Sequence, residues 1–170
     1  LAKAGTVTVN NTATVTQATT IAGIAKAVIY SISDTAGNAL AVAGDAYNEA
    51  VNIEITGNLT IAKADVIKEA GNSGTKTYII EDNAAAVTAA VTGTTGSTAD
   101  VQTLNSATTV TVSGTATFAQ ATTMSGIAKA IVYSISDIKE NIPAGSINSL
   151  NEAVNITLTD DITFLQAKTI

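Results

Sequence analysis

Carboxylates are the side chains of this sequence with the clearest capacity for chemistry. The 170-residue chain has 14 Asp and Glu residues but no His and no Cys. This composition excludes imidazole acid–base catalysis, thiolate nucleophiles and metal sites built from cysteine or histidine. Carboxylate oxygens suit calcium, and Glu152, Asp160 and Asp161 are candidate metal ligands. Calcium is the one cofactor that the sequence suggests, but these three residues alone supply too few oxygens to complete its shell.

Asp34 and Asp137 each follow a predicted strand and precede a predicted helix. A carboxylate in this position accepts hydrogen bonds from the first backbone N–H groups of the helix after it. We therefore predict that both aspartates are helix N-caps. Asn38 and Asn141 recur four residues later, and we predict that they hold the turns by hydrogen bonding. All four residues are interpreted as structural, and no catalytic or cofactor-binding residue is expected.

These aspartates and asparagines belong to a long internal repeat. Residues 1–67 align without a gap with residues 104–170 at a constant offset of 103, so that Leu1, for example, aligns with Leu104. Roughly half of the aligned positions are identical, which indicates a true repeat. The chain is predicted to be one continuous array over 1–170, with a first repeat at 1–103 and a partial copy at 104–170. Both ends fall inside a unit, so we expect a piece of a longer array.

A shorter period is visible inside the long repeat. Runs that alternate aliphatic and polar residues predict strands at 6–10, 29–34, 51–57, 77–82, 109–114, 132–137 and 154–160. Most successive strands are about 23 residues apart, a spacing typical of solenoid coils. The segments between them have helical spacing of Ala and Ile, with Thr12 as the expected cap of the first helix. Residues 92–98 are predicted to form a flexible insertion.

The predicted fold is therefore an α/β solenoid with a parallel sheet and short helical crossovers, and tandem β-sandwich modules are the alternative. The side chains expected to face the core are those of Val7, Val9, Tyr30, Ile32, Val51, Ile53, Ile55, Tyr78, Ile80 and their copies. The Thr, Ser, Asn and Glu residues between them are expected to form a polar outer face.

Overall charge and hydropathy limit the partners. The formal net charge is −6 and the isoelectric point is about 4.4, whereas nucleic-acid binding needs clustered Lys and Arg. No stretch approaches the roughly 20 apolar residues of a membrane span. We expect neither a nucleic-acid partner nor a membrane span.

Three segments carry a resemblance to known proteins: Tyr30-Ser-Ile-Ser-Asp-Thr-Ala-Gly-Asn, Asn48-Glu-Ala-Val-Asn-Ile and Thr115-Ala-Thr-Phe-Ala-Gln-Ala-Thr-Thr. Together they resemble the Ala/Thr-rich tandem repeats of very large bacterial, often cyanobacterial, cell-surface or secreted proteins. The calcium-binding Gly-Gly-x-Gly-x-Asp nonapeptides of some of those proteins are missing here. The resemblance implies an extracellular, array-forming role at the cell surface and implies no catalytic residue.

The sequence shows no nucleophile elbow and no phosphate-binding loop. We therefore predict a non-enzymatic structural segment of a layer, filament or adhesin stalk, whose partner is itself through neighbouring repeats or subunits. The alternative is a ligand-binding solenoid that uses the Thr- and Ser-rich strand face for surface glycans or ice.

Overall fold

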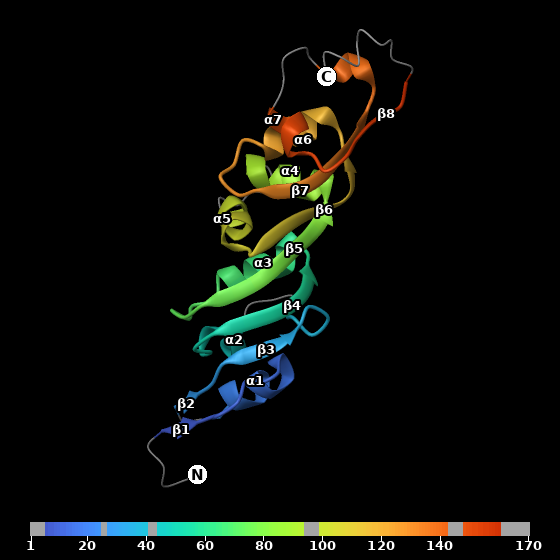
Figure 1. Cartoon of the computed structure of the whole chain (residues 1–170). Helices are drawn as coiled ribbons and strands as arrows, with labels where there is room; N and C mark the ends of the chain where they lie inside the picture. Colours follow the sequence, from blue (N-terminus) through green and yellow to red (C-terminus); the bar gives the residue numbers. More distant parts are fainter. Residues whose placement is uncertain (1–5, 25–26, 41–43, 94–98, 143–147, 161–170) are drawn as a thin grey trace. The chain divides into compact units, whose positions relative to one another are not determined.

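The structure is a computed structural model that describes residues 6–24, 27–40, 44–93, 99–142 and 148–160 (Figure 1). Strands and helices largely alternate along this part of the chain. Its strands are β1 (Val7–Thr8), β2 (Val28–Ile29), β3 (Ile32–Thr35), β4 (Ile53–Leu59), β5 (Lys76–Asn83), β6 (Thr109–Ala116), β7 (Ile131–Asp137) and β8 (Ile156–Leu158). Its helices are α1 (Val15–Ala22), α2 (Asp45–Asn48), α3 (Ile61–Lys68), α4 (Ala84–Thr92), α5 (Ala99–Ser106), α6 (Phe118–Met124), the 3₁₀ helix η1 (Lys139–Asn141) and α7 (Asn148–Glu152).

The strands form parallel sheets. β1 pairs with β2, and β3 to β8 pair in chain order in a six-stranded parallel sheet. Parallel neighbours cannot be joined by a tight hairpin, so each connection has to cross over the sheet, and most of the helices lie in these connections. The predicted α/β class with a parallel sheet is confirmed, and the β-sandwich alternative is wrong because sandwich sheets are antiparallel.

Strand register gives a step close to the predicted coil length. Val7 pairs with Val28 and Ile32 with Ile53, so each partner lies 21 residues further along the chain. Between β5 and β6 the connection is longer, because helices α4 and α5 both lie there. A uniform solenoid period of about 23 residues stays a prediction.

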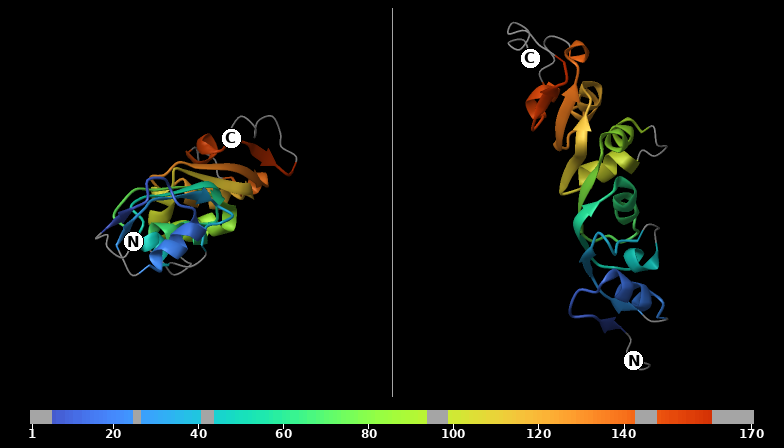
Figure 2. Two further views of the ribbon diagram at one scale, coloured as in Figure 1. Left: turned by 90° about the horizontal axis from the view of Figure 1, so that it is seen from below. Right: turned by 90° about the vertical axis from the view of Figure 1, so that its right-hand side faces the viewer.

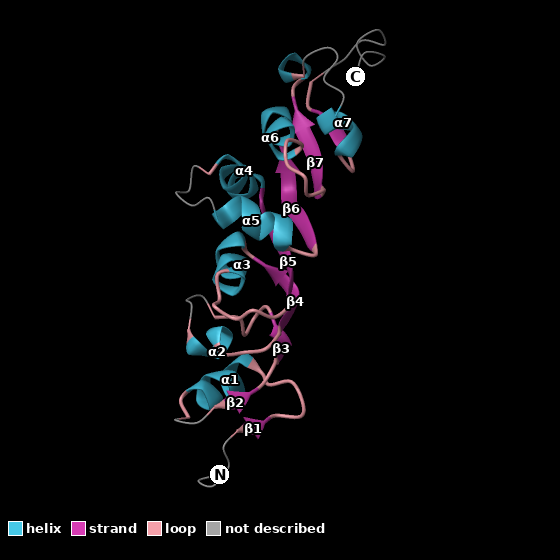
Figure 3. Cartoon of the chain, turned by 90° about the vertical axis from the view of Figure 1, so that its left-hand side faces the viewer, coloured by secondary structure: helices cyan, strands magenta, loops and turns pink. Residues whose placement is uncertain are grey.

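The chain divides into two compact units, residues 1–79 with 106–108 (unit 1) and residues 80–105 with 109–170 (unit 2). In unit 1, helices α1, α2 and α3 lie on one side of strands β3 and β4 (Figures 2 and 3). In unit 2, α4 and α6 pack against each other and against β6, and α6 also contacts β7 and α7. None of the described helices is long and apolar enough to cross a membrane.

The side of the strands that faces the helices forms the core of each unit. In unit 1 the side chains of Tyr30, Ile32, Ile53 and Ile55 are at most 2% exposed. Their alternation with more exposed residues is the period of two that a half-buried strand requires. Val110, Val112, Tyr133 and Ile135 are likewise buried in unit 2, and Tyr78 and Ile80 of β5 are buried as well. Val7 and Val9, to which Val110 and Val112 correspond, are only half-buried, so the inward prediction holds less well for them.

The inward prediction is wrong for Val51 and Val154, which are 45% and 62% exposed. β4 begins only at Ile53 and β8 only at Ile156, so the two valines lie in the turns that enter these strands. The pleat that alternates side chains between the two faces of a sheet does not apply there. Ile156 is also exposed, at 40%, although its copy Ile53 is buried at 1%.

Helix α1 begins two residues later than predicted. Its N-cap is Thr14 and not Thr12, because Ala13 still forms a bridge to Ile32 of β3. The Thr14 hydroxyl accepts a hydrogen bond from the Gln17 N–H at 3.2 Å, and the Gln17 side chain accepts one from the Thr14 N–H at 2.9 Å. This reciprocal pair is a capping box, and its Thr-x-x-Gln spacing could have been recognised in the sequence.

Candidate functional site

The carboxylate of Asp34 lies at the centre of a hydrogen-bond network in unit 1. Its Oδ2 accepts from the backbone N–H of Val15, the first residue of α1, at 2.8 Å. Its Oδ1 accepts from the Asn38 side-chain amide at 2.9 Å and from the backbone N–H of Thr35 at 2.8 Å. The aspartate therefore joins the end of β3, the turn after it and the start of α1.

Unit 2 contains the same network around Asp137. Oδ2 accepts from the N–H of Phe118, the first residue of α6, at 2.9 Å. Oδ1 accepts from the Asn141 amide at 2.7 Å and from the Ile138 N–H at 2.9 Å. The corresponding distances in the two units agree within 0.2 Å.

The prediction that these aspartates cap the helices after them is wrong. Helix α2 begins at Asp45 and has Gly44 as its N-cap, and η1 follows Ile138. Asp34 and Asp137 instead bind the first N–H of the helix that precedes them in the chain, because strand pairing brings the end of each strand beside that helix. Asn38 and Asn141 orient the two carboxylates, so all four residues have contacts that hold turns and helix ends together.

The hydrogen bonds determine how the two carboxyl groups titrate. For Asp34, desolvation by burial raises the pKa, but the hydrogen bonds from Asn38, Val15 and Thr35 outweigh it, and the pKa lies below its usual value. For Asp137, the hydrogen bond from Phe118 is the largest cause of a lowered pKa. Both groups are therefore held as anions near neutral pH, which suits an acceptor and does not suit a general acid.

Buried tyrosines form a second recurring feature. The Tyr30 hydroxyl donates to the carbonyl of Ala46 at 2.9 Å, and the Tyr133 hydroxyl donates to that of Ser149, the copy of Ala46, at 2.7 Å. Burial is the main cause that raises the pKa of each phenol to about 12. A buried phenol that stays neutral and bonds to a helix carbonyl links a strand to the next helix, and it offers no nucleophile.

An asparagine ladder, formed by Asn48 and Asn52, is a feature that the sequence reasoning missed. Asn48 Oδ1 accepts from the backbone N–H of Gly71 at 2.8 Å, and Asn52 Oδ1 accepts from that of Thr75 at 2.9 Å. Each pair is separated by 23 residues in the sequence. The recurrence of Asn-x-x-x-Asn before β4 and, at Asn151 and Asn155, before β8 is the sequence signal that could have revealed it.

The candidate metal ligands do not come together in the described residues. Asp160 Oδ1 accepts from the backbone N–H of Lys139 at 2.9 Å, and its Oδ2 lies 3.6 Å from the Lys139 ammonium. Glu152 is exposed at the end of α7, and Asp161 lies outside the described residues. No group of three or more acidic side chains that could hold a metal ion occurs in the part of the chain that the structure describes.

Two Ser-x-x-Lys spacings, Ser73 with Lys76 and Ser136 with Lys139, have the residue types of a serine–lysine catalytic pair. Burial lowers the pKa of Lys76, but its ammonium donates to the carbonyl of Lys68, the last residue of α3, and to that of Ala70. The hydrogen bond to Glu140 is the main cause that raises the pKa of Lys139. The Lys76 ammonium is therefore engaged with helix carbonyls and the Lys139 ammonium with carboxylates, whereas a general base has to be deprotonated and free to accept.

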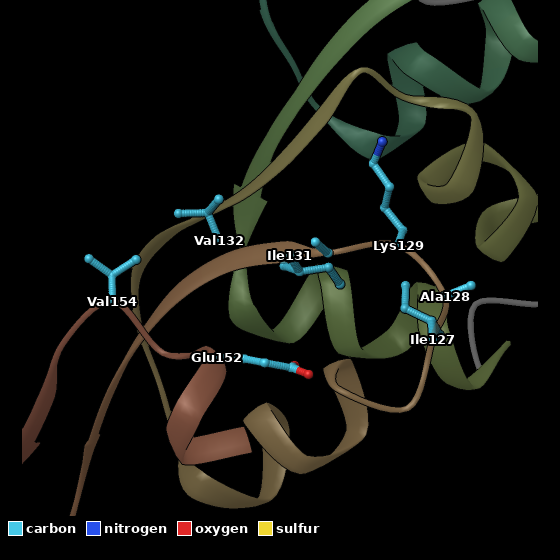
Figure 4. Close-up of a pocket in the computed structure, with 8 residues that line it drawn as sticks. Ile127, Ala128, Lys129, Ile131, Val132, Glu152 and Val154 are labelled. Atoms are coloured by element: carbon cyan, nitrogen blue, oxygen red, sulfur yellow. The ribbon is translucent and has the colours of Figure 1, made fainter. Parts of the chain in front are cut away.

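A hollow of about 350 Å³ lies on unit 2 between the α6–β7 connection and the end of α7 (Figure 4). Its lining is mainly aliphatic, with Lys129 and Glu152 as the charged side chains. In Figure 4 the Lys129 side chain extends away from the Glu152 carboxylate. The lining residues are Ile127, Ala128, Lys129, Ala130, Ile131, Val132, Glu152 and Val154. They contain no nucleophile paired with a base, so the hollow has the features of a contact surface more than those of a reaction site.

Comparisons with protein-family models, with curated proteins and with solved structures find no match to this chain. The functional interpretation therefore rests on the repeat and on the geometry of the recurring networks.

Proposed function

We propose that this chain is a non-enzymatic structural repeat segment of an extracellular bacterial cell-surface protein. In this proposal α/β coils of about 23 residues stack as a solenoid and give length and stiffness to a layer, a filament or an adhesin stalk. The partners are neighbouring repeats or further copies of the chain. The resemblance to Ala/Thr-rich tandem repeats supplies the cell-surface assignment.

The observation that carries the proposal is that the polar groups of the recurring networks are used for holding the strands, turns and helices of each copy together. The carboxylate oxygens of Asp34 and Asp137 accept hydrogen bonds from backbone N–H groups and from the side chains of Asn38 and Asn141. A catalytic or ligand-binding carboxylate would keep at least one oxygen directed at a substrate. Preservation of this geometry in both copies is what a structural repeat requires.

Exposed aliphatic side chains on the strands and on the turns that enter them also support contacts between proteins. Ile29 and Val51 in unit 1 and their copies Val132 and Val154 in unit 2 are all more than 40% exposed. The N–H of Val51 donates to the Tyr30 carbonyl, so Val51 lies beside the residue that follows Ile29. These aliphatic side chains interrupt the Thr and Ser rows that a regular ice-binding face would need, and they favour association with another apolar surface.

The assembly state of the purified chain tests the proposal. We expect light scattering after size-exclusion chromatography to show species larger than a monomer that grow with protein concentration, and negative-stain images to show filaments or sheets. Measurements in calcium and in EDTA determine whether the cation strengthens assembly. A chain that stays monomeric at every concentration, or that turns over a substrate in a hydrolase screen, would contradict the structural role.

A further inference from the structure

Strands β4 and β8 occupy equivalent positions in the two copies of the repeat but have different neighbours. β4 lies between β3 and β5 in the sheet, whereas β8 pairs with β7 and has no second neighbour among the described strands. The same residue type shows the consequence, since Ile53 of β4 is 1% exposed and Ile156 of β8 is 40% exposed. The segment that covers the edge of β4 therefore indicates what kind of segment would pair with the open edge of β8.

Three hydrogen bonds hold the segment that enters β5 against the edge of β4. Asn48 and Asn52 accept from the N–H groups of Gly71 and Thr75, at 2.8 and 2.9 Å. The N–H of Ile53 donates to the Thr75 carbonyl at 2.9 Å. Two side-chain amides thus bind the backbone of the incoming segment before the regular strand pairing begins.

The incoming segment is also selected by its shape. A Cβ atom at Gly74 would lie 1.5 Å from the carbonyl oxygen of Val51, so only glycine fits there. The Asn72 amide donates to the same carbonyl at 3.4 Å. The β4 edge therefore requires glycine at the position of Gly74, and it accepts the backbone N–H groups of residues 71 and 75.

The edge of β8 carries the same receiving groups. Asn151 and Asn155 stand at the positions of Asn48 and Asn52, and Val154 stands at that of Val51. All three residues are exposed, and the side chains of the two asparagines have no hydrogen-bond partner in the described part of the chain. Val154 retains its own backbone contact, because its N–H donates to the Tyr133 carbonyl at 2.8 Å just as that of Val51 donates to Tyr30.

We propose that Asn151, Val154, Asn155 and Ile156 form a docking edge for a parallel β-strand that is preceded by a glycine equivalent to Gly74 and is supplied by a further repeat. This proposal rests on the proposed function and names the contact through which repeats join. Asn151 and Asn155 accept two backbone N–H groups four residues apart, and the Val154 carbonyl requires glycine at the position between them. The main-chain ladder then continues along β8, as in other cases of strand addition.

A labelled peptide with the sequence of residues 71–83, added to the full chain, tests the docking edge by fluorescence anisotropy. We expect saturable binding. Asn155→Ala in the chain should weaken it about fivefold or more, because one hydrogen bond is lost, and Asn105→Ala, at an exposed asparagine away from this edge, is the matched control. A peptide with Gly74→Ala should show no measurable binding.

Methylation of single peptide nitrogens tests which edge of the peptide strand docks. An N-methyl group on Thr75 removes the donor to Asn155 and should abolish binding. An N-methyl group on Tyr78 should be tolerated, because in the chain the Tyr78 carbonyl accepts from Thr108 on the side away from β4. Equal loss from the two methylated peptides would contradict the edge of the peptide strand that we propose to face β8.

The outcomes separate this inference from the proposed function. No binding of the unmodified peptide, or equal binding by the Gly74→Ala peptide, overturns the docking edge. If the chain alone still assembles in light scattering, that failure leaves the structural role in place. Specific binding of the peptide to a chain that does not assemble would support the docking edge and contradict the structural role.

Discussion

The two copies of the repeat differ in how their first strand reaches the helix after it. β6 runs without interruption from Thr109 to Ala116, whereas β1 stops after Thr8 and the chain regains the sheet only as a bridge at Ala13. Gly114 of β6 has a φ of 77°, and Asn11 stands at its position in the first copy. No non-glycine residue in the described part of the chain has a positive φ. Glycine therefore allows a bulge that keeps the strand intact, and asparagine at this position does not adopt it.

Strand register is the same in the two copies despite this difference. Val7 pairs with Val28 as Val110 pairs with Ile131, and the bridge from Ala13 to Ile32 corresponds to the pair Ala116 with Ile135. The buried face of each strand determines register, because a slip of one residue would turn the aliphatic side chains outward. The residue at the position of Asn11 and Gly114 therefore affects the length of the first strand and not its register.

The second difference between the two copies is a hydrogen bond of the first copy whose donor and acceptor residues are both replaced in the second copy. The buried Tyr47 hydroxyl accepts from the Leu40 N–H at 3.0 Å. The second copy has Leu150 in place of Tyr47 and Pro143, which lies outside the described residues, in place of Leu40. Leucine has no hydroxyl and proline has no N–H, so the second copy has lost both partners of this hydrogen bond. Replacing both partners avoids leaving one of them unpaired.

The largest effect is expected for the hydroxyl of Tyr47. Tyr47→Phe leaves the Leu40 N–H without its partner and should lower the free energy of unfolding by about 1 to 3 kcal/mol. Leu150→Met at the copied position conserves volume and should cost less than about 1.5 kcal/mol. Urea denaturation measures both.

A double variant that places both residues of the second copy in the first copy tests whether the donor and the acceptor are coupled. Tyr47→Leu should be destabilising, and adding Leu40→Pro should recover part of the loss, because proline has no N–H to leave unpaired. A double variant no more stable than Tyr47→Leu alone would show that the two positions are not coupled.

The next effect is expected at the bulge of β6. Gly114→Ala should cost about 1 to 2 kcal/mol, because alanine disfavours a positive φ and no atom lies within 4 Å of the new Cβ to add a clash. Gly37→Ala, where φ is not positive, is the control. Conversely, Asn11→Gly should lengthen β1, which hydrogen exchange of the residues between Thr8 and Ala13 would detect. Equal costs of the two alanine substitutions would rule out backbone strain as the cause.

The smallest effect is expected from the aspartate networks. Asp34→Asn and Asp137→Asn should each cost about 1 kcal/mol at neutral pH, a low value because both carboxylates are partly exposed. Since the pKa of each carboxyl is lowered in the folded state, its contribution is complete above the ordinary value of 3.8 and is lost as the pH falls through the folded pKa.

Melting curves recorded at a series of acidic pH values test whether the stabilising contribution of each carboxylate is lost as the pH falls. The difference between the natural chain and either variant should be constant near neutrality and should shrink below pH 3.8. Glu54→Gln, at an exposed carboxylate on the outer face, is the control. Unequal behaviour of the two aspartates would contradict the equivalence of the two networks.

Local patterns in the sequence determined the fold class and much of the core. Alternation of residues such as Tyr30 and Ile32 with polar neighbours depends only on the two-residue period of a strand, so it could be read directly. The offset of 103 likewise indicated which features would recur. The Thr-x-x-Gln capping boxes are local signals as well, although the prediction placed the first cap at Thr12 and missed Thr14.

Tertiary structure alone decided which groups met across the repeat. Asp34 was expected to bind the helix after it, yet its partner Val15 lies 19 residues earlier, where strand pairing brings the two together. Within the insertion predicted at 92–98, Thr92 ends helix α4, Gly93 is the C-cap of that helix, and residues 94–98 lie outside the described residues. Helix α5 also lengthens this connection, and the sequence patterns did not predict it. The contact of Asn52 with Thr75 also spans 23 residues. Sequence periodicity specifies which face of each element is apolar, but strand register determines which polar atoms lie within hydrogen-bonding distance, and register is set by the packing of the whole layer.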